Sequence, residues 1–546
     1  MGIPVATITC AGQVLDPKFE LVEVEVRREL NRVPEARLVL LDGDVAEGKF
    51  ELSDTTLFLP GNEVAISMRY EGDRADTPVF KGLVVSHGIE ARVDGTRLRL
   101  ELKDAAFKLT RQRKSAVFRD QRDDEVIGQI VRNAGLSAGT MDTANVKHKE
   151  LVQYHASDWD FIVSRADVQG LVLNVHEGKV NLSKMSPSGS PKLKLTFGMD
   201  EIHEFDLHID GGQQFAEVAG VGWDLAAQKT SGPETAASVS PPGGNANPKS
   251  IAQSLGGASQ TLLHPVAMAQ GELKAWANAR MLRSRLAFLR GRIVIQGNAI
   301  LTPLDLIELA GVGARFNGKA LVSGVTHTMS ADGWKTELSL GLAPDGFARR
   351  PDITEVASAG LLPSITGLQV ALVAGFEEDP DGEHRIRLQL PALPDSQGAI
   401  WARLLRPDAG KDRGFVFWPE AGDEVIVGFL DNDPRQPVVL GALHGSKNAP
   451  PAFVGAPSDK NIKRAIVSRG GIVIGFDDDK LQVSVKTPGG QELMLDDDAK
   501  AITLTDQHGN KITLDDKGIT LKSAKDFNVD AASGKVVIKG STVDVQ

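Results

Sequence analysis

Residues 501–521 read Ala-Ile-Thr-Leu-Thr-Asp-Gln-His-Gly-Asn-Lys-Ile-Thr-Leu-Asp-Asp-Lys-Gly-Ile-Thr-Leu. Apolar residues recur here in pairs at positions i and i+2, and turn-forming residues separate the pairs. Because side chains alternate between the two faces of a strand, this pattern predicts short strands with one apolar face each. Polar and glycine-containing segments such as Asp506–Asn510 predict the turns between them.

The same pattern runs through residues 469–546. The pairs are Ile472/Ile474, Leu481/Val483, Leu493/Leu495, Ile502/Leu504, Ile512/Leu514, Ile519/Leu521, Phe527/Val529, Val536/Ile538 and Val543/Val545. Each strand contributes about two apolar side chains, which is too little to offset the entropy of ordering it. Repeat proteins solve this problem by stacking, and three intertwined chains solve it better by closing a thin prism around a dry axis.

We therefore predict that a homotrimer forms an intertwined triple-stranded β-helix over residues 469–546. The side chains expected on its axis are Ile472, Ile474, Leu493, Leu495, Ile502, Leu504, Ile512, Leu514, Ile519, Leu521, Val536, Ile538, Val543 and Val545.

The composition narrows the class of protein. At 546 residues the chain is long enough for three or four domains. The net charge of −11 is unfavourable for a nucleic-acid partner, which needs a basic surface. The single cysteine, Cys10, excludes an intrachain disulfide and is expected to be a small buried apolar side chain. The first residues show no secretory signal, and no run of 18 apolar residues predicts a membrane helix.

Residues 1–343 divide by pattern into three segments. Alternating strands fill residues 1–110, two helices near Glu125–Arg132 and Trp159–Val168 mark residues 111–170, and strands resume over residues 171–343. The two helices are expected to begin at Asp123-Asp124 and at Ser157-Asp158. Residues 226–262 predict an exposed flexible loop, and an amphipathic helix is expected from about Val266 to Leu289.

A second β domain follows a proline- and glycine-containing linker at residues 344–366. Residues 367–445 contain short strand patterns that fit a small barrel of the oligonucleotide/oligosaccharide-binding (OB) type. One of those strands is expected at Gly414–Trp418, with Phe417 and Phe429 in the core and Trp401 and Trp418 in the core or at a trimer contact. A second linker, residues 446–468, leads to the ladder.

The small barrel resembles the one in the family of valine-glycine repeat protein G (VgrG) and contractile-phage baseplate spikes. The resembling run includes Phe417-Trp-Pro-Glu-Ala-Gly-Asp-Glu-Val-Ile-Val-Gly-Phe429 and, after Leu430, Asp431-Asn-Asp-Pro-Arg-Gln-Pro-Val-Val-Leu-Gly-Ala-Leu443. Phe80-Lys-Gly-Leu-Val, Val152–Phe161 and Phe316-Asn-Gly-Lys-Ala-Leu-Val resemble the hub region of the same family.

The resemblance implies a mainly β fold with minor α: a hub of two tube-like β-barrels with helical insertions, then the OB-type barrel and the β-helix. It implies a homotrimeric spike that joins the inner tube and baseplate proteins of a contractile injection machine to a membrane-puncturing needle. It also implies a separate tip protein of the PAAR type, expected to contact Val543, Val545 and Gln546, and possible effector cargo. Such a protein would be made in the cytoplasm, assembled into the baseplate, and found outside the cell or in the target after firing.

The sequence contains no motif that marks an enzyme or a cofactor or metal site. The acidic turns at Asp477–Asp479 and Asp496–Asp498 lack the spacing of a calcium loop and fit turn formation. Gly135-Leu-Ser-Ala-Gly139 matches a nucleophile pattern, but it follows a helix instead of a strand, so Gly135 fits a helix C-terminus. The alternatives are a spike that cleaves or binds surface glycan, and a nucleic-acid-binding barrel.

The family serves type VI secretion, R-type or phage tails, and extracellular injection particles. We expect no fused toxin after the β-helix and no lysozyme-like insert between the small barrel and the needle, and the final residues Lys539–Gln546 contain no His-x-His pattern. These features favour the extracellular particle.

Overall fold

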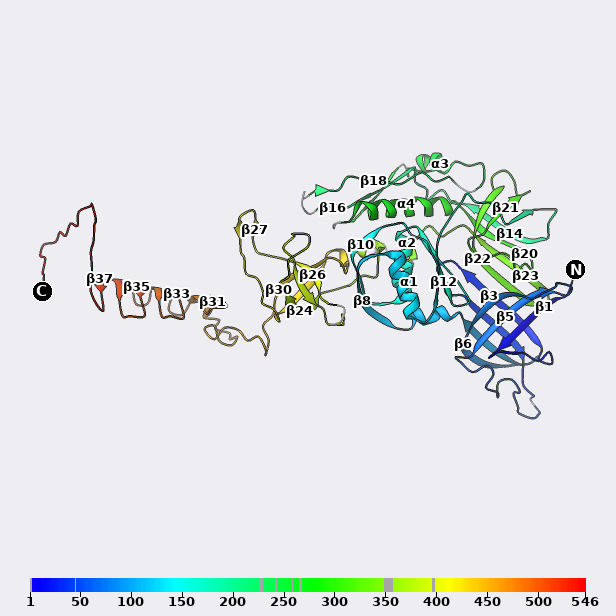
Figure 1. Cartoon of the computed structure of the whole chain (residues 1–546), viewed down its shortest axis with the longest axis horizontal. Helices are drawn as coiled ribbons and strands as arrows, with labels where there is room; N and C mark the ends of the chain where they lie inside the picture. The colour runs from blue at the N-terminus through cyan, green and yellow to red at the C-terminus, as the bar shows by residue number, and fades with distance from the viewer. Residues whose placement is uncertain are drawn as a thin grey trace. The chain divides into compact units, whose positions relative to one another are not determined.

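The computed structural model of the chain describes residues 2–44, 46–224, 229–240, 243–257, 259–264, 268–347, 357–394 and 398–546. They form two compact units, residues 1–442 and residues 443–546. Strands dominate both units (Figure 1). None of the helices within the described ranges is long and apolar enough to span a membrane.

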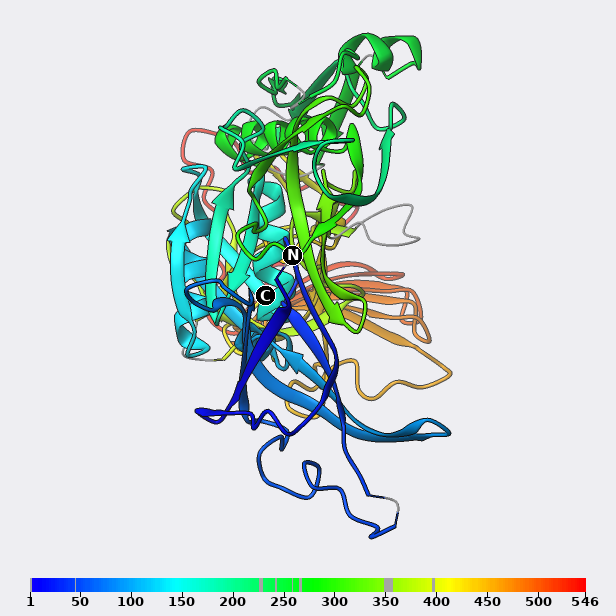
Figure 2. The ribbon, with the colours of Figure 1, turned by 90° about the vertical axis from the view of Figure 1, so that its right-hand side faces the viewer.

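The largest element of the first unit is a 13-stranded sheet. Its strands are β1 (Pro4–Cys10), β2 (Gln13–Val14), β3 (Leu21–Glu29), β4 (Glu35–Leu41), β5 (Glu63–Tyr70), β6 (Thr77–Arg92), β7 (Gly95–Lys103), β13 (Leu193–Thr196), β14 (Ile202–Ile209), β20 (Leu289–Gln296), β21 (Leu306–Ala310), β22 (Gly318–Ser330) and β23 (Gly333–Leu340). Strands alternate as expected; in β3, Val24 and Val26 are buried while Arg27 is exposed. Figure 2 shows these long strands in blue and green.

Two separate cores lie against this sheet. Leu38, Leu100 and Cys10 belong to the core of the first segment, while Ile293 and Leu338 belong to that of the third. The two segments are nevertheless joined, because β22 pairs antiparallel with β3 from Gly324↔Glu29 to Met329↔Val24. The expectation of a small buried Cys10 is confirmed, and its thiol donates to the Leu57 carbonyl at 2.8 Å.

The second segment carries the two helices expected there. Its elements are η1 (Ala105–Thr110), β8 (Arg113–Arg122), α1 (Asp123–Asn133), β9 (Ser137–Met141), β10 (Lys147–Ser157), α2 (Asp158–Val168), β11 (Leu171–His176) and β12 (Lys179–Lys184). Ser157 caps α2 as expected and accepts from the Asp160 amide at 3.0 Å. The N-cap of α1 is Arg122, and not Asp123 or Asp124. The two aspartates lie in the first turn, where their negative charges interact favourably with the positive end of the helix dipole. Gly135 follows α1 with φ 71° and leads into β9, which confirms a helix end.

Most of the described residues in 226–262 are exposed, as expected, but the segment is not a loop throughout. The region from β15 onward contains β15 (Glu217–Val221), β16 (Trp223–Asp224), β17 (Lys229–Thr230), β18 (Glu234–Thr235), α3 (Pro248–Ser254) and β19 (Ser259–Leu263). β19 pairs in parallel with β15, and α3 buries Ala252 while β19 buries Leu262. Two small apolar anchors therefore order a segment whose composition looks polar. Residues 225–228, 241–242 and 258 lie outside the described ranges.

The long helix of the third segment is α4, Gln270–Leu286, which is shorter at both ends than expected. Part of the predicted linker at residues 344–366 packs against it. Leu361 and Leu362 are buried in one core with Leu273 and Met281 of α4, just after η3 (Ala357–Gly360). Residues 348–356 lie outside the described ranges.

The OB-type barrel is confirmed as a closed five-stranded barrel. Its order is β24 (Gln369–Gly375), β25 (Ile386–Gln389), β26 (Ile400–Leu404), β30 (Pro437–Ala442) and β29 (Glu424–Phe429). Phe429 packs against the barrel core as expected. The strand expected at Gly414–Trp418 is wrong: a small hairpin of β27 (Ala409–Gly410) and β28 (Arg413–Gly414) ends there, and Phe417 is exposed. Val117 and Val152 of the second segment share the barrel core, so the two are packed together.

The second unit is a seven-stranded antiparallel ladder in which every strand pairs with its sequence neighbour. The strands are β31 (Lys463–Val467), β32 (Val473–Asp477), β33 (Gln482–Lys486), β34 (Glu492–Asp496), β35 (Ala501–Thr505), β36 (Lys511–Asp515) and β37 (Gly518–Lys522) (Figure 1). The ladder begins inside the segment expected to be a linker, because β31 precedes residue 469.

The strands expected beyond Lys522 are absent from the described chain. Phe527/Val529, Val536/Ile538 and Val543/Val545 lie in residues without strand structure. A strand needs a ladder partner for its backbone groups, and the single chain supplies none there.

Candidate functional site

One face of the ladder is apolar from β32 to β37, and we call it the apolar face. Cross-strand pairing places its twelve side chains in two rows. The first row is Ile474, Val485, Leu493, Leu504, Ile512 and Leu521, and the second is Phe476, Val483, Leu495, Ile502, Leu514 and Ile519. Neighbours within a row sit directly opposite each other, where side chains of adjacent strands interact best.

The opposite face of the ladder is polar. Its central row runs Ser484, Met494, Thr503, Thr513 and Thr520. An antiparallel sheet with one apolar and one polar face is built to have one side covered and the other in water.

No residue of the described second unit, 443–546, covers the apolar face. Its twelve side chains are between 36% and 72% exposed. A contiguous exposed apolar surface of this extent marks an interaction site.

Nine of the fourteen predicted axis residues lie on this face. They are Ile474, Leu493, Leu495, Ile502, Leu504, Ile512, Leu514, Ile519 and Leu521. Ile472 lies just before β32, and Val536, Ile538, Val543 and Val545 lie beyond the last strand, as does Gln546 of the expected tip contact.

One predicted pair is shifted by two residues along the strand, and one aromatic residue was missed. Leu481 sits in a turn with φ 52°, and the strand's apolar pair is Val483/Val485. Phe476 completes the second row but was not assigned to the axis. A residue count shows spacing, whereas the position of the turn decides which residues the strand includes.

The acidic turns of the ladder serve its backbone. Asp477 accepts from the amide of Asp479, Asp496 from that of Ala499, and Asp506 from those of His508 and Asn510. Carboxylates in such turns replace missing backbone partners. Across the described ranges, no three His, Cys, Asp or Glu side chains are grouped so that they could hold a metal ion.

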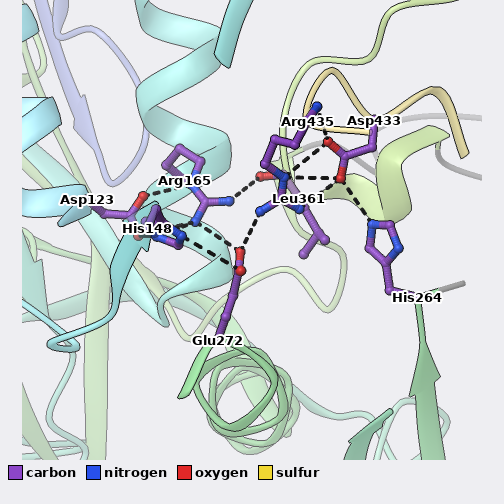
Figure 3. Close-up of polar contacts among 8 residues, drawn as sticks. All are labelled: Asp123, His148, Arg165, His264, Glu272, Leu361, Asp433 and Arg435. Carbon is purple, nitrogen blue, oxygen red and sulfur yellow. Dashed lines mark hydrogen bonds and ion pairs between the residues drawn. The ribbon is translucent and has the colours of Figure 1, made fainter. Parts of the chain in front are cut away.

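A second feature, which the sequence did not predict, is a buried cluster of charges in the first unit (Figure 3). On one side, Arg165 of α2 is fully buried and donates from Nε to Asp123 Oδ1 at 2.7 Å. His148 Nε2 lies 2.8 Å from Asp123 Oδ2. Glu272 at the start of α4 accepts from Arg165 Nη2 at 3.4 Å.

The other side of this cluster comes from the OB-type barrel. Arg435, in the turn between β29 and β30, donates from Nη1 to Glu272 Oε1 at 2.9 Å and from Nη2 to Asp433 Oδ2 at 2.8 Å. Asp433 is fully buried and lies 3.3 Å from His264 Nε2. Glu272 therefore bridges two arginines, one from α2 and one from the barrel (Figure 3). We call these residues the hub–barrel cluster.

Mutual pairing keeps the cluster charged despite its burial. Burial raises the pKa of Asp123, but Arg165 and His148 outweigh it and lower the pKa to about 2. Burial likewise opposes ionisation of Glu272 and Asp433, and the charge of Arg435 reverses it so that both pKa values are lowered. Leaving a buried charge without its partner costs stability. The cluster therefore stabilises the contact of the barrel with α2 and α4.

Sequence reasoning missed the cluster for a clear reason. Arg165 and Arg435 stand 107 and 163 residues from Glu272. Charged residues are mostly exposed, and no local spacing distinguishes these from the rest. Asp433-Pro-Arg435 does lie within the run that carries the resemblance, which was the available signal.

Comparisons with known proteins cover nearly the whole chain. The Alg8 N-terminal domain matches residues 2–331, the type VI secretion system/phage-baseplate injector OB domain residues 369–444, and the phage baseplate V C-terminal trimerisation domain residues 482–546. The chain is 24% identical over 425 residues to the type VI secretion system spike protein VgrG1b of Pseudomonas aeruginosa, covering 70% of this chain and 53% of the relative. VgrG1a of the same organism is 24% identical over 467 residues, covering 78% of this chain and 68% of the relative.

A solved structure shares the fold. A chain from the half-lidded Francisella PdpA-VgrG complex has a TM-score of 0.58 at 9% identity and covers 96% of this chain and 88% of that one. This chain spans about half the length of VgrG1b.

The first prediction concerns Arg435. Arg435→Met leaves Glu272 and Asp433 with less compensation in a buried site, so we expect the first unit to lose about 3–5 kcal/mol of stability. Urea unfolding followed by tryptophan fluorescence measures the loss. Arg413→Met is the matched control: its ion pair with Asp408 is exposed, and we expect it to cost less than about 1 kcal/mol. Equal effects of the two substitutions would show that the cluster does not lock the barrel.

The second prediction concerns pH. The pKa of Asp123 is depressed from its ordinary value of 3.8 to about 2, so its contribution is complete above pH 4 and is lost as the pH falls towards 2. This carboxylate should account for about 2 kcal/mol of unfolding free energy across that window. Asp123→Asn should flatten the acid limb of the stability curve by that amount. An unchanged slope between pH 4 and pH 2 would contradict the assignment.

Proposed function

Because this chain belongs to the family of VgrG and contractile-phage baseplate spike proteins, we propose that it is the central hub and spike of a contractile injection machine. In this role a homotrimer joins the inner tube to a needle that punctures the target envelope. The proposal rests above all on the apolar face, which is fully formed in one chain and uncovered by it.

Three copies can bury the apolar face by turning it towards a common axis. Three sheets then form the walls of a triangular prism, with the polar faces in water and the apolar rows inside. Completing the burial of twelve half-exposed side chains would stabilise each chain by on the order of 10 kcal/mol. The trimerisation domain matched at residues 482–546 supports this arrangement.

The ladder refines the expected intertwined needle. From Lys463 to Lys522 each strand already has its neighbours within the chain, so the three copies need only pack face to face there. Residues 523–546 contain the apolar pairs that lack strand partners in their own chain. We propose that the chains intertwine in this last segment.

The needle's end is proposed to carry a tip protein of the PAAR type. Val543 and Val545 are 54% and 92% exposed, and β37 has one unpaired edge. An open strand edge and exposed apolar side chains each favour binding of a covering partner. The contact would include Val543, Val545 and Gln546.

The first unit is proposed to contact the inner tube and other baseplate proteins, with effector cargo as a further possible partner. The similar chain in the Francisella PdpA-VgrG complex is bound to another protein, which supports the proposal that this chain also has protein partners. The protein would be assembled in the cytoplasm into a baseplate, and leave the cell with the particle or enter the target on firing. Its proposed work is mechanical, because the needle would transmit force to the target envelope. Three carboxylates of the ladder, Asp477, Asp496 and Asp506, accept hydrogen bonds from turn amides, which is in keeping with a structural role.

The third prediction tests the trimer axis. Leu504→Asp places one carboxylate per chain on the axis, where it would be buried unpaired, so we expect the trimer to be lost. Light scattering should give the mass of one 58.4 kDa chain in place of three.

Thr503→Asp is the matched control, because Thr503 is the adjacent residue on the polar face of the same strand. It should leave the trimer intact. A trimer that persists with Leu504→Asp would refute the axial placement of the apolar face.

A further inference from the structure

The OB-type barrel carries four consecutive exposed apolar residues, Phe415-Val-Phe-Trp418, directly after β28. They are between 47% and 64% exposed, and we call them the aromatic arm. A run of exposed apolar side chains of this size marks an interaction site. The hairpin that precedes the arm stands away from the barrel strands (Figure 1).

The arm is held in position by its own barrel. The guanidinium of Arg406 lies 4.7 Å from the centre of the Trp418 ring and also donates to the Phe417 carbonyl. The Trp418 ring packs edge-to-face on Phe376, with centroids 6.5 Å apart and planes at 83°. The Phe415 amide donates to the Asp408 carbonyl at 3.0 Å. A fixed set of exposed rings pays little entropy when a partner binds them.

A second exposed apolar surface lies on the outside of the same barrel. It consists of Leu368, Val370, Leu372, Ile426 and Leu440, and we call it the leucine face. Four of these residues are between 41% and 62% exposed, and Ile426 pairs with Val370 across β24 and β29.

Two glycines open the centre of the leucine face. A Cβ on Gly428 would lie 3.5 Å from Leu440 and 3.6 Å from Leu368, so the glycine brings the backbone close to the surface between the two leucines. Gly441 pairs with Ile426 and has open space above it. Glycine inside a strand often marks a place where another chain approaches closely.

We propose that the aromatic arm of one copy packs on the leucine face of the next copy around the three-fold axis. This inference rests on the proposed homotrimer. A cyclic trimer is held by heterologous contacts, in which each copy offers two different surfaces to its two neighbours. The arm and the leucine face are two such surfaces: one presents aromatic rings, and the other presents leucines around two glycines. Arg406 borders the arm and Glu424, opposite Leu372, borders the leucine face, so these two charges are of opposite sign and can pair across the contact.

Cysteine cross-linking tests this contact directly. Cys10 is the chain's only cysteine and is buried, so a bismaleimide reacts with introduced thiols. Full-length chains carrying Phe417→Cys and chains carrying Leu440→Cys, each with its own affinity tag, are produced together and cross-linked as the assembled protein. We expect a two-chain product that contains both tags, at roughly tenfold or more the yield of either variant alone, since neighbouring thiols have a high effective concentration.

The control pairs Phe417→Cys with Val93→Cys, an exposed position in the turn after β6. It should give no enrichment. Light scattering of the same samples separates the two levels of the proposal. A trimer without mixed cross-links, or with equal cross-links in the single variants, overturns the arm contact and leaves the spike function standing. A protein with the mass of one chain overturns both.

Discussion

The need to cover one apolar face governs the second unit of this protein. Two continuous rows of aliphatic and aromatic side chains line one side of the ladder, while serine and threonine line the other. Except at the edges of β31 and β37, the backbone groups of the ladder strands are paired within the chain, so association is driven mainly by the burial of side chains. Burial of apolar surface is strongly favourable but non-directional, so it does not by itself orient the chains relative to one another. The regular spacing of side chains along the two rows supplies that alignment.

In the first unit, buried ion pairs stabilise the contact between the OB-type barrel and the helices. The barrel shares apolar residues with the second segment, yet the contact also contains Glu272 between Arg165 and Arg435. Apolar packing tolerates sliding, whereas a carboxylate shared by two guanidiniums fixes position and direction. A molecule that transmits force gains from having both: a core that resists separation and a charge cluster that resists slippage.

Local periodicity was enough to predict most of the strands, the barrel and most of the apolar face. Leu504 and Leu514 could be placed because spacing within one strand determines which side they face. Three kinds of feature could not be predicted from local periodicity. Leu481 was misplaced because a turn, not the spacing, ends its strand. Arg435 was missed because its partner Glu272 is 163 residues away. Phe417 was expected in a core, since apolar character does not tell a residue covered by its own chain from one available to another.

Pairing between sequence neighbours also has a kinetic meaning for the ladder. Each of the seven strands finds its partner across one short turn, so the contacts are local and the sheet can form quickly within a single chain. Association then follows as a separate step between preformed sheets, and its rate depends on protein concentration. Between these two steps the chain passes through a stage with a long open apolar surface, which makes the interval after synthesis the period of greatest exposure to aggregation.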